Sequence, residues 1–183
     1  MRTCFTTASY WPAASGWKSS SARALGLIAS PIAVKPLIKA LETDKDDTVR
    51  MSCVEALGSI GDKSALDSLK AALTSKNARL KCMAAASLGK LGSADGAEAA
   101  LSESANADPK VRVAAIEALG DIGKMDEAAV KAIRQALKDT DASVVRVAET
   151  SRIKLGIEPE PVIQKEEPKK ETTPKPAKGK TGQ

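Results

Sequence analysis

The chain has 183 residues, a net charge of +5 at neutral pH and no histidine. Without histidine, the usual serine and cysteine triads and an imidazole general base are excluded. The charge excess lies near the N-terminus, because residues 42–156 hold 17 basic and 18 acidic side chains. Recognition of nucleic acid needs a basic stripe along the binding element, so nucleic acid is not an expected partner.

Residues 1–16 show no regular pattern and stay unassigned. They contain Phe5, Tyr10 and Trp11, three of the four aromatic residues of the chain. The segment lacks an apolar run of signal-peptide length, although its serine-rich, acid-poor composition also occurs in organelle transit peptides. Disorder and a misassigned start both remain open explanations. No segment is long and apolar enough to span a membrane, so no membrane partner is expected.

A short phrase recurs along residues 17–156. It reads EALGSIGD at 55–62, SLGKLGS at 87–93 and EALGDIGK at 117–124. Its second glycine returns every 31 to 33 residues, which predicts an array of about four to five similar units. The second glycines fit the left-handed residue that closes a helix, and they are Gly61, Gly92, Gly123 and Gly156.

Each unit is predicted to contain two helices. The second helix has apolar residues at helical spacing, and its copies are 48–60, 79–91 and 110–122. Capping residues precede these segments, such as Asp108 before Pro109. The first helices are expected at 34–42, 64–73, 96–104 and 128–138. Neither helix can bury its apolar face alone, so stacked units must share one core. We therefore expect an all-α fold, a right-handed α-solenoid.

The first glycine of the phrase lies inside the second helix, where it costs about 1 kcal/mol relative to alanine. It recurs at Gly58, Gly89 and Gly120. Three matched positions indicate that the missing side chain lets a partner helix approach closely. Fraying of the helix end is the alternative explanation.

A cation recurs near the start of each second helix, at Lys18, Arg50, Lys81 and Arg112. We interpret these residues as a structural ladder that ties adjacent units together through acidic turn residues. The available partners are Asp44, Asp46, Asn106 and Asp108. An anionic ligand site is the alternative.

The next position along these helices holds Met51, Cys82 and Val113, with Glu55 and Glu117 one turn further. At about 100° per residue, this position lies roughly opposite the core-facing residues. Exposed apolar stripes often mark interaction sites, so these five residues are the predicted concave partner-binding groove. The alternative is that solenoid curvature shields them.

Two stretches, DDTVRMSCVEALGSIGD and ADPKVRVAAIEALGDIGK, resemble HEAT repeats, in the short variety of phycobilin lyases and many bacterial HEAT-repeat proteins. The resemblance implies a scaffold for protein–protein interaction, or a subunit or chaperone-like component of a bilin lyase. A DNA-binding protein of the alkyl-base glycosylase type is a third possibility. Iron-binding HEAT-repeat hydroxylases use histidine–glutamate pairs, which this chain lacks.

From these features we expect a non-enzymatic scaffold with a protein partner and with no cofactor or metal. Cys4, Cys53 and Cys82 show no paired spacing, so a disulfide framework is not implied and a cytoplasmic location is expected. Residues 157–183 are rich in lysine, glutamate and proline, which predicts a disordered tail.

Overall fold

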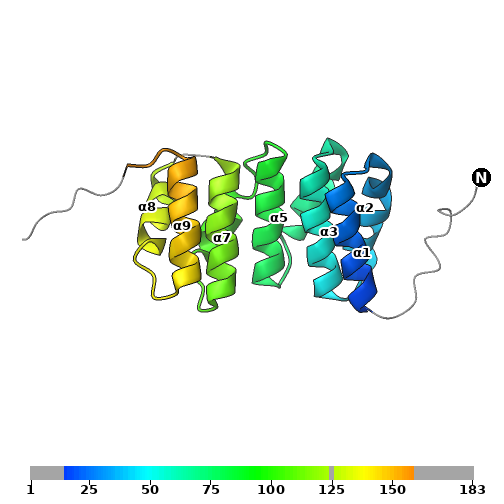
Figure 1. Cartoon of the computed structure of the whole chain (residues 1–183), viewed down its shortest axis with the longest axis horizontal. Helices are drawn as coiled ribbons and strands as arrows, with labels where there is room; N and C mark the ends of the chain where they lie inside the picture. Colours follow the sequence, from blue (N-terminus) through cyan, green and yellow to red (C-terminus); the bar gives the residue numbers. More distant parts are fainter. Residues whose placement is uncertain (1–14, 124–125, 159–183) are drawn as a thin grey trace, which may run out of the picture.

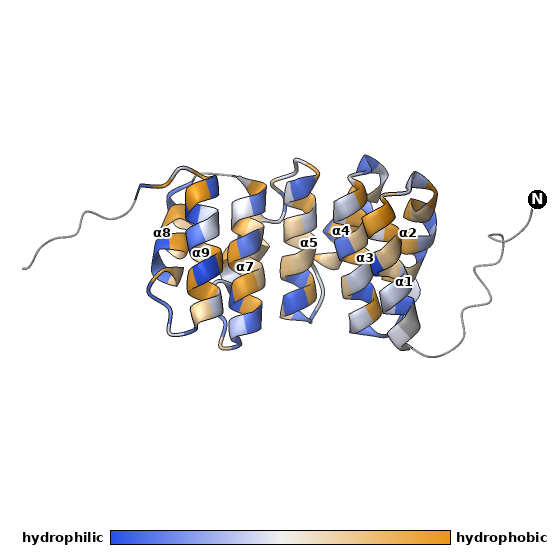
Figure 2. Cartoon of the chain, in the orientation of Figure 1, coloured by the Kyte–Doolittle hydropathy of each residue, from blue (hydrophilic) through white to orange (hydrophobic). Residues whose placement is uncertain are grey.

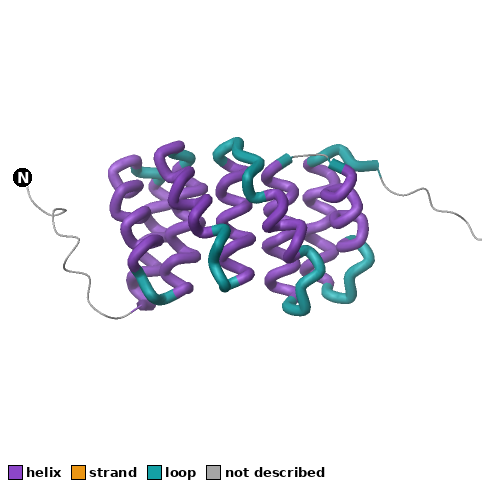
Figure 3. Tube along the Cα trace, turned by 180° about the vertical axis from the view of Figure 1, so that it is seen from behind, coloured by secondary structure: helices purple, strands orange, loops and turns teal. Residues whose placement is uncertain are grey.

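The computed structural model describes residues 15–123 and 126–158, and these form a two-layer array of helices without strands (Figure 1). The predictions for residues 1–14 and for the tail beyond residue 158 lie outside the described residues. In Figure 1 the second helices form the near layer and the first helices lie behind them. Seen from behind, short loops join the two layers (Figure 3). The fold is the all-α solenoid that the repeats predict.

The helices pair as the repeat phrase indicates. The second helices are α1 (Ser15–Ile28), α3 (Asp47–Ile60), α5 (Ala78–Lys90), α7 (Pro109–Ile122) and α9 (Ala142–Lys154). The first helices are α2 (Val34–Thr43), α4 (Leu66–Ala72), α6 (Ala97–Glu103) and α8 (Glu127–Ala136). Two 3-10 turns, η1 (Pro31–Ala33) and η2 (Lys63–Ala65), precede α2 and α4. Four complete pairs therefore follow α1, which has no first helix among the described residues.

Side-chain caps and left-handed residues define where the second helices begin and end. Asp46, Asn77, Asp108 and Asp141 each accept a hydrogen bond from a backbone N–H two residues further on. The four second glycines have φ between 66° and 80°, the left-handed conformation that glycine adopts without strain. After α1 the same position is Ala29, with φ of 50°.

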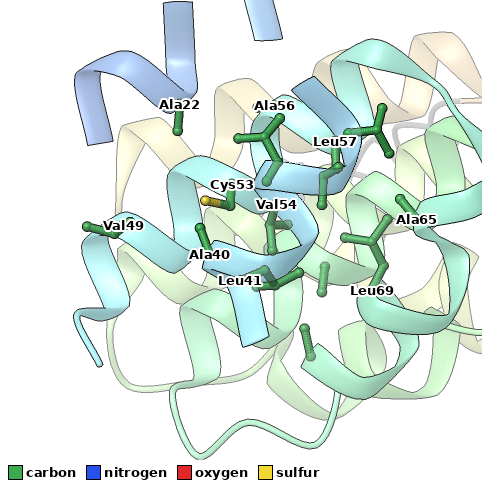
Figure 4. Packing of buried hydrophobic residues seen from close by; sticks show 14 of the residues in the cluster. Ala22, Ala40, Leu41, Val49, Cys53, Val54, Ala56, Leu57, Ala65 and Leu69 are labelled. Atoms are coloured by element: carbon green, nitrogen blue, oxygen red, sulfur yellow. The ribbon is translucent and has the colours of Figure 1, made fainter. Parts of the chain in front are cut away.

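The core is built from small and aliphatic side chains. Leu37 of α2, Leu57 of α3 and Leu69 of α4 are fully buried in one cluster. Figure 4 shows Leu57 and Leu69 in this cluster together with Ala22 of α1. A second cluster contains residues of α5, α6, α7, α8 and α9. It includes Ile157, which is 4% exposed. Ile157 and Arg152 exchange backbone and side-chain hydrogen bonds of 3.0 and 2.9 Å. The packed array therefore reaches one residue into the segment expected to be tail.

Successive second helices meet where one of them carries a glycine. A Cβ atom on Gly89 would stand 2.6 Å from the backbone nitrogen of Ile122 in α7. A Cβ atom on Gly58 would lie 2.6 Å from Ser87 Oγ, and one on Gly120 would lie 2.5 Å from Ser151 Oγ. We call each such contact a glycine joint. The helix that approaches is the second helix of the next unit, whereas the first helix of the same unit packs on another face.

Two buried serines add a hydrogen bond to their joints. Ser87 Oγ donates to the carbonyl oxygen of Val54 at 2.9 Å, and Ser151 Oγ donates to that of Ile116 at 3.2 Å. Both acceptors lie in the preceding second helix. Each bond ties two units together and satisfies a hydroxyl that is less than 5% exposed.

We expect Gly89→Ala to destabilise the fold by about 1–3 kcal/mol, the usual cost of overpacking, although alanine gains helix propensity. The added Cβ would overlap backbone atoms of α7, which cannot rotate away. Denaturant unfolding followed by circular dichroism measures the change. Gly16→Ala is the matched control, because nothing lies within 4 Å of its Cβ position. Equal stability of the two variants would contradict close packing at Gly89.

Replacing Ala29 with glycine should stabilise the protein by about 1 kcal/mol, because an L-residue is strained in the left-handed conformation. The substitution restores the residue that the other four units use at this position. Ala24→Gly, at an exposed site within α1, should instead lower stability by a similar amount. A melting temperature that falls with Ala29→Gly would show that Ala29 carries no strain.

Candidate functional site

The described residues contain no group of three or more histidine, cysteine, aspartate or glutamate side chains that could hold a metal ion. Nor does any helix in the described ranges have the length and apolar character needed to cross a membrane. The candidate sites in the described residues are the cation ladder, the Met51–Cys82–Val113 position and the ends of the array.

The ladder cations contact the turn of the following unit where that turn offers a carboxylate. Lys18 donates to Asp44 at 3.0 Å. Arg112 forms a two-pronged contact with Asp139, through hydrogen bonds of 2.7 and 2.8 Å. In each case the aspartate also accepts from the N–H of the capping residue two positions further on. One carboxylate thus joins a cation of one unit to the helix start of the next.

The other two cations face turns that lack a carboxylate at this position. Ser75 and Asn106 stand where the other turns have Asp44 and Asp139. Arg50 instead donates to Asp47 in its own helix at 3.0 Å and to the carbonyl oxygen of Leu41 at 3.2 Å. Lys81 reaches Glu103, at the end of α6, at 2.7 Å. All four cations are therefore engaged within the chain, which supports a structural role over an anionic ligand site.

The contacts shift the acidity of the carboxylates. The Arg112 guanidinium holds the pKa of Asp139 below its ordinary value, and the Lys81 ammonium does the same for Glu103. For Asp44, the hydrogen bond from the N–H of Asp46 is the largest cause of a lowered pKa, and Lys18 adds to it. Asp139 and Glu103 were not among the partners expected from sequence. Asp139 has the turn position of Asp44, so alignment of the units contained a signal for it, whereas Glu103 lies at the end of α6.

A second charged row crosses the last three second helices. Asp121 in α7 contacts Lys154 in α9 at 2.6 Å and Lys90 in α5 at 3.7 Å. The aspartate side chain is 13% exposed, so this contact lies at the edge of the core. The row links three consecutive units through one carboxylate, next to the joint formed by Gly89.

The predicted groove is not an exposed apolar stripe, and the prediction is wrong at Cys82. This residue is fully buried, packed with Val111, Ala114 and Ala115 of α7. Burial raises the pKa of its thiol to about 12. Met51 and Val113 are partly buried and pack against the two main core clusters. A helix in a solenoid has neighbours on both sides, so the position opposite the first helix lies against the next second helix.

Glu55 and Glu117 are exposed, unlike the apolar members of the predicted groove. The equivalent residue of α5 is Ala86, which is 8% exposed. Arg23 of α1 lies 3.9 Å from Glu55. Figure 2 shows hydrophilic and hydrophobic residues interspersed along the second helices, without a continuous apolar band. The accessible part of this layer is therefore polar, and any partner there would meet charges.

The large exposed apolar side chains lie at the ends of the array, which sequence reasoning missed. Leu27, Ile28 and Ile32 are 88, 71 and 85% exposed at the N-terminal end, and Ile153 in α9 is 65% exposed. An open hollow of about 640 Å³ beside Ile153 also includes Val145 and Arg146. Unit-by-unit alignment contained a signal, since Leu27 replaces Ser59 and Ile153 replaces Gly120.

Replacing both Met51 and Val113 with glutamate should lower the free energy of unfolding by about 2 kcal/mol or more, because carboxylates would be buried without partners. Thermal unfolding monitored by circular dichroism tests this. The control introduces the same charges at exposed positions, Ser59→Glu with Thr150→Glu, and should unfold near the wild-type temperature. If the variant with glutamate at positions 51 and 113 were as stable as the wild type, Met51 and Val113 would be exposed and the groove prediction would hold for them.

Comparison with known proteins places this geometry in a family. A model of HEAT repeats matches residues 18–81 and 70–151. Over 52 residues the chain is 46% identical to the bilin biosynthesis protein PecE of Nostoc sp., a segment that covers 28% of this chain and 21% of that protein. The chain therefore matches about a fifth of the length of this relative.

Two solved structures show the same fold. One is the complex of CpcE and CpcF of phycocyanin lyase from Nostoc sp., with a TM-score of 0.60, 23% identity, and coverage of 86% of this chain and 71% of the other. A designed armadillo repeat protein in complex with the peptide (KR)4 has a TM-score of 0.52 and 21% identity. It covers 75% of this chain and 79% of the designed one.

These relatives correct one expectation. We expected the chain not to be an enzyme, and that expectation is overturned because the proteins it matches are a bilin biosynthesis protein and a component of phycocyanin lyase. The absence of histidine excludes catalysis by an imidazole group of this chain. It does not exclude enzymes that contain a HEAT-repeat subunit. With repeats matched from residue 18 to residue 151, the chain belongs to the HEAT-repeat family.

Proposed function

We propose that this chain is a subunit of a bilin lyase-type assembly, in which its solenoid binds a second protein. The 46% identity with the bilin biosynthesis protein PecE carries this proposal. The shared fold with the CpcE–CpcF complex supports a protein partner, since that structure contains two different chains. The exposed apolar ends of the array are consistent with a protein contact.

The second-helix layer offers exposed cations that are not part of the ladder. Arg79 and Lys110 occupy the same position, in the first turns of α5 and α7, and both are exposed. A bilin is an open-chain tetrapyrrole with carboxylate side chains, so cations beside helix N-termini suit it electrostatically. Ladder residues such as Arg112 already contact carboxylates of the chain. Arg79 and Lys110 are therefore the residues proposed to meet the pigment.

The test is purification of the tagged full chain from a bilin-producing host, with mass spectrometry and visible absorption spectra of the product. We expect recovery of a bilin or a bilin-carrying protein together with a partner chain. Arg79→Glu with Lys110→Glu should reduce recovered pigment at least several-fold while keeping the partner. Ser59→Glu with Thr150→Glu, which adds negative charge at other exposed positions, is the surface control. A preparation without any bilin or bilin-carrying protein would contradict the proposal.

A further inference from the structure

The N-terminal end of the array exposes a position that is buried in every other unit. This position receives the glycine of the preceding second helix, as Ala56 receives Gly26, whose Cβ would lie 2.7 Å from the Ala56 Cα. Ser87 and Ser151 receive Gly58 and Gly120 in the same way, whereas Gly89 meets Ile122, one turn beyond the equivalent Ala118. Ser87, Ala118 and Ser151 are all less than 5% exposed. In α1 the copy is Ala24, which is exposed. Among the described residues, no glycine-bearing helix lies against this surface of α1.

Exposed apolar side chains and cations follow Ala24 in the sequence, at the N-terminal end of the array. Leu27 and Ile28 lie at the end of α1, and Ile32 lies in η1 beside it. Lys35 and Lys39 are exposed in α2, and the one acidic residue of that helix, Glu42, accepts a hydrogen bond from Ser68 in α4. A surface that is small at the centre, apolar at the rim and basic on one side fits a helix with matching properties.

The opposite end of the array lacks the complementary feature. Ile153 of α9 occupies the position of Gly26, Gly58, Gly89 and Gly120. At those glycines a Cβ would already lie within 2.7 Å of the next helix, so the larger isoleucine side chain prevents an equally close approach. A further unit therefore cannot stack on α9 at the spacing found inside the array.

We propose that the face formed by Ala24, Leu27, Ile28 and Ile32 docks the terminal helical repeat of a partner solenoid. The partner's last helix would carry glycine against Ala24 and carboxylates opposite Lys35 and Lys39. The contact would repeat the glycine joint in the form that Gly26, Gly58 and Gly120 make within the chain. This inference goes beyond the proposed function, because it concerns which end binds and what the partner presents, whether or not a bilin is involved.

A second copy of the wild-type chain is not the proposed occupant. Its C-terminal end presents Ile153 where the joint needs glycine. Its N-terminal end carries the same cations, Lys35 and Lys39, so two such ends would repel each other. Residues 1–14 are a third candidate occupant, and the experiment below distinguishes this segment from a partner protein.

The probe is the full-length Ile153→Gly chain, because this substitution gives α9 the residue of an internal joint. We expect the wild-type chain to sediment as a 19.0 kDa monomer and Ile153→Gly to form head-to-tail oligomers of at least twice that mass. Ile153→Ala, which keeps a Cβ, should remain mainly monomeric. Excess wild-type chain should limit the oligomers to dimers, since it can receive a glycine helix but cannot offer one.

A second substitution identifies the receiving face. Ala24→Arg, at an exposed site, should abolish oligomers of Ile153→Gly while circular dichroism shows unchanged helix content. A folded Ile153→Gly chain that stays monomeric would overturn the proposal, and so would oligomers that survive Ala24→Arg. Self-association of the wild-type chain would overturn the closed C-terminal end. Oligomers that appear only after deletion of residues 1–14 would make that segment the occupant instead.

Discussion

The close approach of successive second helices at glycine is the contact on which the rest of this structure depends. A helical glycine costs about 1 kcal/mol relative to alanine, so each one must be offset by what its absent side chain permits. Here it permits backbone contact, as between Gly89 and Ile122, and it brings small residues such as Cys82 and Ala115 together across α5 and α7. The alanine-rich core follows, because larger side chains would separate the helices.

This packing determines which surfaces remain free. Each internal second helix is covered by its first helix and by two neighbouring second helices, so only a narrow polar strip stays exposed. Glu55 and Glu117 lie on that strip, whereas Met51 and Val113 turn toward the next helix. Apolar side chains therefore reach solvent mainly where a neighbour is missing, at Leu27 and Ile32 on one end and at Ile153 on the other.

Much of the fold could be predicted from sequence because each repeat contains the local signals that start, continue and end its helices. Helical periodicity, caps such as Asp108 and closing glycines such as Gly61 fixed the helices to within a few residues. Residue-by-residue placement around a helix failed at Cys82, since a single-helix projection contains no information about neighbouring units. Of the ladder partners expected from sequence, Asp44 does pair with Lys18, whereas Arg112 and Lys81 pair with Asp139 and Glu103.

The two kinds of contact between units tolerate change to different degrees. The ladder accepts aspartate, serine or asparagine in its turns, because long side chains such as Lys81 can reach another carboxylate, here Glu103. Each ladder cation keeps an acceptor after the rearrangement, so no largely buried charge is left unpaired. The glycine joint has no such freedom, since the atoms in contact are backbone and Cβ atoms. Steric fit at the joints, more than charge, therefore decides which helices can follow one another, and an isoleucine at position 153 is sufficient to end the sequence of equivalent contacts.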